Sequence, residues 1–159
     1  MLIQTSAQMA INAPIERVFD GSIDCQNLPR CFTGYQAIPA ILSATTTDGL
    51  LLHAGSTRIV QNSDGSKITE RIISLQRPTL QTYELLDGLK PPFSWLLRSA
   101  SGKWSYQAID SGTQITWQFE FEMRHLLAYV FFLAMVKHPF QTAQNICLAN
   151  LKRTIEDVD

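Results

Sequence analysis

Arg58 and Glu70 are the charged residues whose spacing is best suited to a binding site, because they flank a turn at residues 63–65. In a two-residue loop Arg58 would lie opposite Arg71, whereas a three-residue loop with Gly65 in the left-handed conformation places it opposite Glu70. We predict the second register, since it pairs opposite charges. On a concave face the pair would orient a ligand carboxylate, phenol or carbonyl; on the outer surface it would be an ion pair contributing less than about 1 kcal/mol.

Few other residues have the type and spacing that a catalytic site, a metal site or a disulfide framework requires. Glu70 and Tyr83 are weak candidates for moving a proton in an enzyme. The three histidines share no metal-ligand spacing, so we predict no metal and no cofactor. Cys25, Cys31 and Cys147 are too few and too irregularly spaced for a disulfide framework. No nucleophile motif such as G-x-S-x-G occurs, and the cysteines are expected to be small buried apolar residues.

Aromatic residues alternate along two expected strands near the C-terminal half of the chain. A two-residue loop at positions 111–112 places Tyr106 opposite Trp117 and Trp104 opposite Phe119, all on one apolar face. This face either lines a cavity or fills a solid core. The expected ligand-binding residues are Arg58, Glu70, Tyr83, Trp95, Trp104, Tyr106, Trp117 and Phe119, with Phe140, Ala143 and Cys147 opposite them on a helix.

Seven segments have the composition of strands, with β-branched and aromatic residues bounded by Gly, Pro, Asp or Asn. Pro14 and Glu16 favour a short helix directly after the first of them. A second short helix is expected within residues 21–33. The expected strands are residues 3–11, 34–42, 56–62, 67–75, 79–85, 103–109 and 114–123.

Apolar residues at helical spacing between positions 140 and 155 indicate a C-terminal helix. Pro139 either begins this helix or kinks a longer one that starts near Leu126. The apolar run at residues 126–136 is well short of the roughly 20 residues that a membrane-spanning helix needs. We favour its packing inside the domain over a peripheral contact with a membrane surface; an exposed patch there would indicate a protein-interaction domain.

The connection at residues 87–93 contains two adjacent prolines and two apolar residues, Leu89 and Phe93. Such apolar side chains are not expected in a loop that is exposed to solvent. The connection either folds over the mouth of the expected cavity or is a plain connection whose apolar residues fill a gap.

Composition and charge narrow the class of protein. A chain of 159 residues, 45% of them hydrophobic, suits a single domain spanning residues 1–159. Its 13 basic and 14 acidic residues give a net charge of -1 and no positive stripe, so nucleic acid is not an expected partner. The N-terminus lacks the charged start and apolar core of a secretion signal, and we expect a cytoplasmic protein.

Several short motifs occur in a fixed order along the chain: Ile11-Asn12-Ala13-Pro14-Ile15-Glu16-Arg17-Val18-Phe19-Asp20, Gly55-Ser56-Thr57-Arg58, Glu70-Arg71-Ile72, Pro78 followed by Tyr83-Glu84-Leu85, Gly112-Thr113-Gln114-Ile115-Thr116-Trp117 and Leu151-Lys152. Together with the order of the expected elements, these motifs resemble the START-like superfamily, also grouped as SRPBCC proteins. Within it the chain is similar to the bacterial branch described as polyketide cyclase/dehydrase or lipid-transport-like. The resemblance covers nearly the whole chain, without the glycine-rich loop of the plant pathogenesis-related members or the metal ligands of the oxygenases.

This resemblance implies an α+β helix-grip fold, with a seven-stranded curved antiparallel sheet, two short helices after the first strand and a long C-terminal helix packed across the sheet. It also implies binding or carriage of a hydrophobic small molecule, such as a lipid, polyketide or aromatic compound, between the sheet and that helix. Because such folds host many functions, two alternatives stay open: a cyclase or dehydratase acting on a polyketide-like substrate, and a protein-interaction domain.

Overall fold

The computed structural model of the protein describes residues 1–158, which form seven strands and five helices. The strands make one antiparallel sheet in the order β1-β7-β6-β5-β4-β3-β2. This sheet, the paired short helices after its first strand and the long C-terminal helix confirm the predicted helix-grip fold. The elements are β1 (Leu2–Ile11), α1 (Ile15–Ile23), α2 (Leu28–Cys31), β2 (Ile41–Thr46), β3 (Thr57–Asn62), β4 (Lys67–Gln76), β5 (Leu80–Asp87), α3 (Phe93–Leu96), β6 (Leu97–Ile109), β7 (Gly112–Met123), α4 (Leu126–Met135) and α5 (Lys137–Glu156).

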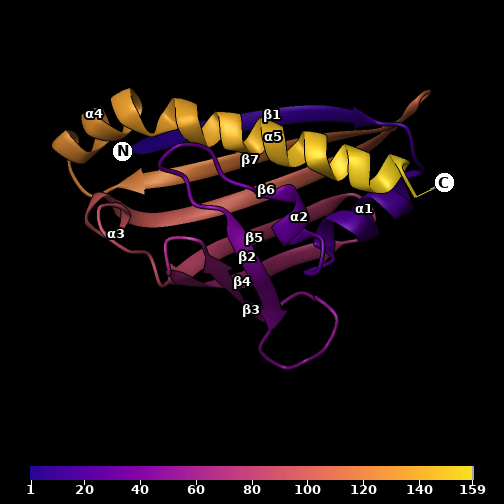
Figure 1. The fold of residues 1–159 in the computed structure, drawn as a ribbon, viewed down its shortest axis with the longest axis horizontal. Coiled ribbons are helices and arrows are strands. Elements are labelled where there is room, and N and C mark those ends of the chain that lie inside the picture. The colour runs from indigo at the N-terminus through magenta and orange to yellow at the C-terminus, as the bar shows by residue number, and fades with distance from the viewer. Residues whose placement is uncertain (159) are drawn as a thin grey trace.

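The C-terminal helix α5 lies beside the edge strand β1, with which it makes extensive contact. Figure 1 shows α5 along one side of the molecule and β2, β3 and β4 at the other, with α1 and α2 beneath the C-terminal half of α5. Helices α3 and α4 lie together at the opposite end of α5 from the C-terminus. One face of the sheet is therefore covered by helices, and the space between them holds the apolar core.

The β3–β4 hairpin has the predicted register. Arg58 pairs with Glu70 across the ladder, and Gly65 adopts the left-handed conformation with φ 80°. The Asp64 side chain accepts hydrogen bonds from the backbone N–H and the hydroxyl of Ser66, which fixes the turn. Charge pairing and turn chemistry agree here, so the sequence is sufficient to place the two residues opposite each other.

The β6–β7 hairpin differs from its predicted register, and the difference preserves the faces of both strands. Trp104 pairs with Trp117, and Tyr106 pairs with Ile115, because the two-residue turn is at positions 110–111. Gly112 belongs to the ladder at φ 132°, where an added Cβ would overlap the backbone at the end of β1. The partner shifts by two residues, so every side chain keeps its predicted side of the sheet.

Two predicted strand boundaries are wrong. Most of the segment 34–42 is irregular and β2 begins only at Ile41, because Gly34 and Gln36 have φ values of 75° and 52° that no strand accommodates. In contrast, β6 begins at Leu97 rather than at position 103. Its residues 99–102 are small and have little intrinsic preference for a strand, but the neighbouring strand β7 supplies the hydrogen-bond partners.

The C-terminal helical region consists of two helices that meet at Val136. Pro139 lies in the first turn of α5, where the first internal hydrogen bond is from Phe140 N to Val136 O, so its missing N–H costs no helical hydrogen bond. The apolar run before it forms α4, of which only Ala128 and Phe132 are buried. Our expectation that this run packs inside the domain is therefore wrong, since most of its side chains face solvent.

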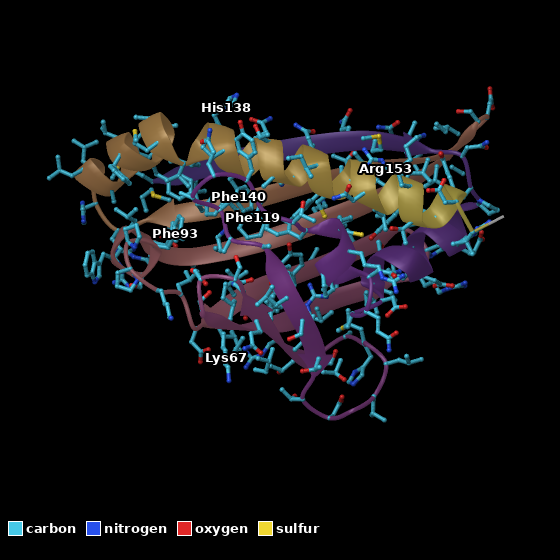
Figure 2. The ribbon with its side chains drawn as sticks, viewed as in Figure 1. Lys67, Phe93, Phe119, His138, Phe140 and Arg153 are labelled. Carbon is cyan, nitrogen blue, oxygen red and sulfur yellow. The ribbon has the colours of Figure 1, made fainter. Side chains whose placement is uncertain are left out.

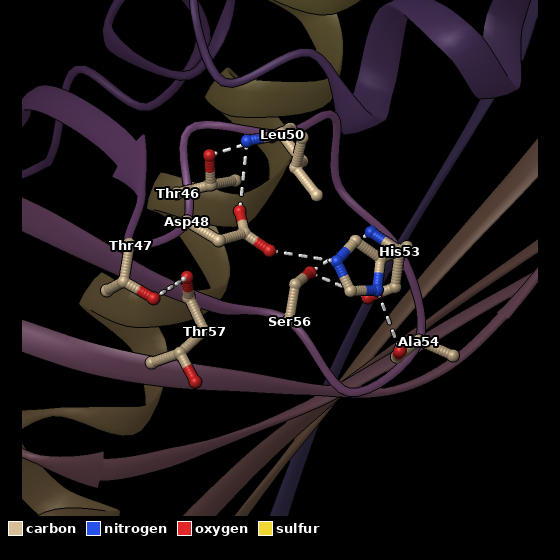
Figure 3. A network of polar contacts seen from close by, with 8 residues as sticks. All are labelled: Thr46, Thr47, Asp48, Leu50, His53, Ala54, Ser56 and Thr57. Atoms are coloured by element: carbon tan, nitrogen blue, oxygen red, sulfur yellow. Dashed lines mark hydrogen bonds and ion pairs between the residues drawn. The ribbon is translucent and has the colours of Figure 1, made fainter.

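The connection between β2 and β3 is held by polar contacts among its own residues, shown in Figure 3. The Nε2 atom of His53 lies 3.0 Å from Oδ2 of Asp48, and its Nδ1 atom lies 3.0 Å from the carbonyl oxygen of Ala54. Asp48 also accepts a hydrogen bond from the backbone N–H of Leu50, while Leu52 is buried in the core. Both ring nitrogens of His53 face acceptors, an arrangement that favours the protonated imidazolium.

Candidate ligand-binding cavity

A cavity of about 140 Å³ lies between the inner face of the sheet and helices α4 and α5. Its wall is mostly apolar and receives side chains from strands β3 to β7 and from all five helices or their adjoining segments. Eight of the eleven residues predicted as ligand-binding are part of the wall: Arg58, Glu70, Tyr83, Trp104, Trp117, Phe119, Phe140 and Cys147.

The aromatic side chains of the wall pack against one another and against α5. Trp104 and Trp117, directly opposite in the ladder, stack with ring centroids 4.7 Å apart. Phe140 projects from α5 toward the sheet, and its ring centroid lies 5.0 Å from that of Phe119 and 4.9 Å from that of Phe121. Figure 2 shows Phe119 and Phe140 close together between α5 and the sheet. These side chains are both core and cavity wall, so the predicted alternatives of lining and filling both hold in part.

Arg58 and Glu70 lie on the inner face of the sheet, which excludes the surface alternative. The Nε atom of Arg58 donates to Oε2 of Glu70 at 2.6 Å, and the two side chains are only 5% and 11% exposed. The guanidinium also lies over the ring of Tyr83, 5.4 Å from its centroid. Its Nη1 atom is buried without a hydrogen-bond partner in the described chain. The cavity wall thus carries an arginine donor that the protein itself leaves unsatisfied.

Burial and charge together set the protonation of Arg58 and Tyr83. Burial alone would lower the pKa of Arg58, but the charge of Glu70 and the hydrogen bond to it outweigh burial and raise that pKa. Burial raises the pKa of Tyr83 well above its ordinary value of 10.0, and the charge of Glu70 adds to the effect. At neutral pH Arg58 is a cation and Tyr83 is a neutral phenol, so both present hydrogen-bond donors and neither is a base.

Three predicted ligand-binding residues are not part of the wall. Trp95 is 68% exposed on α3, because Phe93, two residues earlier and on the opposite side of the helix, occupies the inward position. Tyr106 is buried but does not line the cavity; its hydroxyl lies 2.6 Å from Oγ of Ser22, which does. Ala143 is buried on α5, but it is rotated by about 60° from Phe140 around the helix axis and does not face the cavity.

Sequence reasoning missed several residues of the wall. Gln81 is buried, and its Oε1 atom has no partner in the described chain. It precedes Tyr83 by two positions in β5, so strand alternation alone could have placed it on the same face. Phe132, on the inner side of α4, and Val136, at the junction of α4 and α5, also line the cavity. Nothing in that uniformly apolar segment distinguishes its inner from its outer residues.

The connection at residues 87–93 forms part of the cavity wall. Leu89, Lys90 and Phe93 belong to the wall, and Nζ of Lys90 donates to the backbone carbonyl of Asp64 at 3.2 Å. This bond ties the connection to the β3–β4 turn. Within residues 1–158, no three His, Cys, Asp or Glu side chains gather in a way that could hold a metal ion.

The architecture is that of helix-grip proteins. The sequence matches the family described as "Polyketide cyclase / dehydrase and lipid transport" over residues 3–156, and the chain belongs to this family. None of the curated proteins matches the sequence significantly.

Solved structures share the fold at low sequence identity. A protein of Thermus thermophilus, TTHA0849, superimposes with a TM-score of 0.75 at 14% identity, over 99% of each chain. Ara h 8.0201 gives a TM-score of 0.69 at 17% identity, also over 99% of each chain. The di-domain ARO/CYC protein BexL from the BE-7585A biosynthetic pathway gives 0.73 at 14% identity, over 98% of this chain and 50% of that chain. At such identities the likeness establishes the fold alone.

Proposed function

We propose that the protein binds an apolar small molecule in the cavity, with the guanidinium of Arg58 donating a hydrogen bond to an oxygen at the polar end of the guest. The buried, unpartnered Nη1 atom of Arg58 in an otherwise apolar wall carries this proposal. A buried donor without a partner costs about 1–3 kcal/mol, and an acceptor on the guest would recover that free energy. Family membership supports the class of ligand, since the family description includes lipid transport.

The volume and the polar atoms define the guest more closely. An apolar cavity of about 150 Å³ accommodates benzene, so the space of about 140 Å³ fits a group the size of one aromatic ring. Arg58 selects an acceptor such as a carboxylate, phenol or carbonyl oxygen, and the unpartnered Oε1 atom of Gln81 would accept a hydrogen bond from a donor on the guest.

The indole N–H signals of the tryptophans test the proposal in one NMR titration. Benzoate, p-cresol and acetophenone present the three acceptor types on a single ring, and toluene is the same ring without an acceptor. We expect at least one of the three acceptor probes to shift the signals of Trp104 and Trp117, which line the cavity, and to bind more tightly than toluene. Trp95, exposed on α3, is the internal control.

A variant that fills the cavity separates binding inside it from binding elsewhere. Val60 is a buried wall residue on β3, whereas Ile73 on β4 is half exposed. Val60→Phe should abolish the shifts, and Ile73→Phe should retain them. Native mass spectrometry of gently purified protein, followed by extraction, would identify a co-purified guest. Unshifted Trp104 and Trp117 signals with every probe, and no guest by mass spectrometry, would overturn the proposal.

A second candidate function is an enzyme of the cyclase or dehydratase type. The observation that favours it is the position of Glu70, a carboxylate in the cavity wall beside the cationic Arg58 and the neutral hydroxyl of Tyr83. Glu70 would be the base and Tyr83 a proton donor. Glu70→Gln keeps the shape of the wall, so it should abolish turnover of a polyketide-like substrate while leaving probe binding in place; retained turnover would exclude this role.

A further inference from the structure

Helices α3 and α4 present a continuous apolar surface to solvent at one end of the molecule. The two helices contact each other, and both lie at the end of α5 opposite the C-terminus (Figure 1). The exposed fractions range from 44% for Phe131 to 79% for Leu127. We call this the α3–α4 surface; its members are Trp95, Leu126, Leu127, Val130 and Phe131.

The composition of α4 is unusual for a helix on the surface of a protein. All ten of its residues, from Leu126 to Met135, are apolar or aromatic, yet only Ala128 and Phe132 are buried. A helix that is apolar on every side is ordinarily enclosed by protein or lipid. Contiguous exposed apolar surface of this kind marks a site of contact with another apolar phase. The packing within the chain therefore leaves α4 half covered.

The charged residues that flank α4 along the chain are of one sign. Arg124 precedes α4 and Lys137 follows it, and the chain has no Asp or Glu between Met123 and Ile155. The nearest preceding acid, Glu122, is paired with Arg98, whose Nη1 atom lies 3.4 Å from its carboxylate. The protein as a whole carries a net charge of -1, so the cations at the two ends of α4, Arg124 and Lys137, are a local excess of positive charge.

We propose that the α3–α4 surface docks on an anionic lipid bilayer, with α4 lying in the plane of the interface. Its apolar side chains would enter the boundary between headgroups and acyl chains, while the cations at its ends would contact anionic headgroups. The ten residues of α4 extend about 15 Å, half the thickness of the hydrocarbon core, and no helix of the described chain is long and apolar enough to cross a membrane. Trp95 suits the interfacial depth, where tryptophan is enriched.

The charge pattern disfavours a second copy of this chain as the occupant. If two α4 helices packed antiparallel, Arg124 of each copy would approach Lys137 of the other. If they packed parallel, like ends would meet. Either arrangement places cations together at the rim of an apolar contact, where they repel each other. An anionic lipid surface supplies the opposite charge at both ends of the helix.

Docking in this orientation would bring the cavity next to the bilayer. Phe132 lines the cavity from the inner side of α4, Val136 from the junction of α4 and α5, and Phe93 from α3. An apolar guest could then exchange between the hydrocarbon phase and the cavity along these helices. This exchange rests on the proposed function, whereas docking itself rests only on the surface and its charges.

Vesicle flotation tests docking with the whole chain and defined lipids. We expect the protein to float with vesicles of phosphatidylcholine containing phosphatidylglycerol and to bind pure phosphatidylcholine more weakly, with binding to the former falling as salt rises. Leu127→Glu should lower the partition coefficient about tenfold or more, because burial of one leucine side chain changes an equilibrium constant by at least about that factor. Leu51→Glu is the matched control, since Leu51 is 92% exposed on the distant β2–β3 connection.

The other outcomes are equally decisive. A wild-type protein that does not float with either lipid composition, or a Leu127→Glu variant that floats as well as wild type, overturns the proposal. So does a stable dimer that Leu127→Glu converts to a monomer, because the occupant would then be a second copy. Trp95→Ser, on the other helix, gives an independent variant if Leu127→Glu fails to fold. The NMR titration with soluble probes reports on the cavity alone, so failure of docking and failure of ligand binding are distinguishable.

Discussion

The ring of Tyr83 lies against the backbone of Gly102, its partner in the β5–β6 ladder, in the space that a side chain at position 102 would occupy. This contact lets the tyrosine lie flat on the inner face of the sheet, beneath the guanidinium of Arg58. A glycine in the middle of a strand often marks such a close approach. Gly102 therefore shapes the polar end of the cavity although it has no side chain of its own.

Gly102→Ala should displace the ring of Tyr83 and destabilise the protein. The added methyl group overlaps the phenol, and inserting a methyl group into a packed interior costs typically about 1–3 kcal/mol. Urea denaturation monitored by circular dichroism measures this change. Ser101→Ala, at the adjacent position facing the other side of β6, is the control and should change the free energy of unfolding by less than about 0.5 kcal/mol. Equal midpoints for Gly102→Ala and wild type would contradict the role of the glycine.

The buried Arg58–Glu70 pair should show strong coupling in a double-mutant cycle. Arg58→Met leaves a buried carboxylate unpaired and should cost about 3–5 kcal/mol, and Glu70→Leu should cost a similar amount, whereas the double variant should cost much less than their sum. The exposed cross-strand pair Arg71–Glu84, 3.9 Å apart, is the control and should couple by less than about 1 kcal/mol. Additive costs at Arg58 and Glu70 would show that the two groups act independently.

Phe140 and Phe131 should differ in their effect on stability, because one faces the cavity and the other faces solvent. Phe140 contacts several rings of the wall, so Phe140→Ala should lower the free energy of unfolding by about 3 kcal/mol and enlarge the cavity. Phe131→Ala should lower it by less than about 1 kcal/mol. Thermal and urea unfolding of both variants provide the comparison; a large loss for Phe131→Ala would place that side chain in the core.

The Asp48–His53 contact should make stability depend on pH. The hydrogen bond to Asp48 and that to the Ala54 carbonyl raise the pKa of His53 above 6.5, and the same contact lowers the pKa of Asp48 below 3.8. The contribution of His53 is therefore complete below pH 6.5 and is lost as pH rises through its raised folded pKa. The contribution of Asp48 is complete above pH 3.8 and is lost as pH falls through its lowered folded pKa.

Measurement of unfolding free energies from about pH 3 to about pH 9 for wild type and His53→Ala checks this behaviour. The difference between the two proteins should be largest between about pH 4 and pH 6.5 and should shrink toward both extremes. His138→Ala controls for the loss of an imidazole, since His138 projects outward from α5 (Figure 2). A difference that is constant across the range would show that the imidazole acts through packing instead of charge.

The local sequence was sufficient to predict the register of a hairpin when its turn residues and its flanking residues favour the same pairing. In the β3–β4 hairpin, the positive φ of Gly65 and the attraction between Arg58 and Glu70 select one register. In the β6–β7 hairpin the predicted partner was wrong, but a shift of two residues leaves Trp104 and Trp117 on the predicted face. The face on which a strand residue lies is therefore predicted more reliably than the position of the turn that follows the strand.

Residues whose position depends on distant segments were not predictable in this way. Trp95 was assigned to the cavity by its residue type alone, and only the short helix α3 decided that Phe93 faces inward instead. Residues 99–102 of β6 are small and have weak strand preference, and they are extended because β7 pairs with them. Likewise, α4 was expected inside the domain because its residues are apolar, but only Ala128 and Phe132 of this helix are buried.

The sequence by itself determined the order of the elements, the alternation of faces and the pairing of Arg58 with Glu70, because these depend on neighbours along the chain or across one turn. Only the tertiary structure decided which face of the sheet α5 covers, and hence that this ion pair is buried with one arginine donor unpartnered. It also decided that α4 remains exposed. A strand pair has two chemically possible faces, and burial is a property of the whole assembly of elements, which no local pattern specifies.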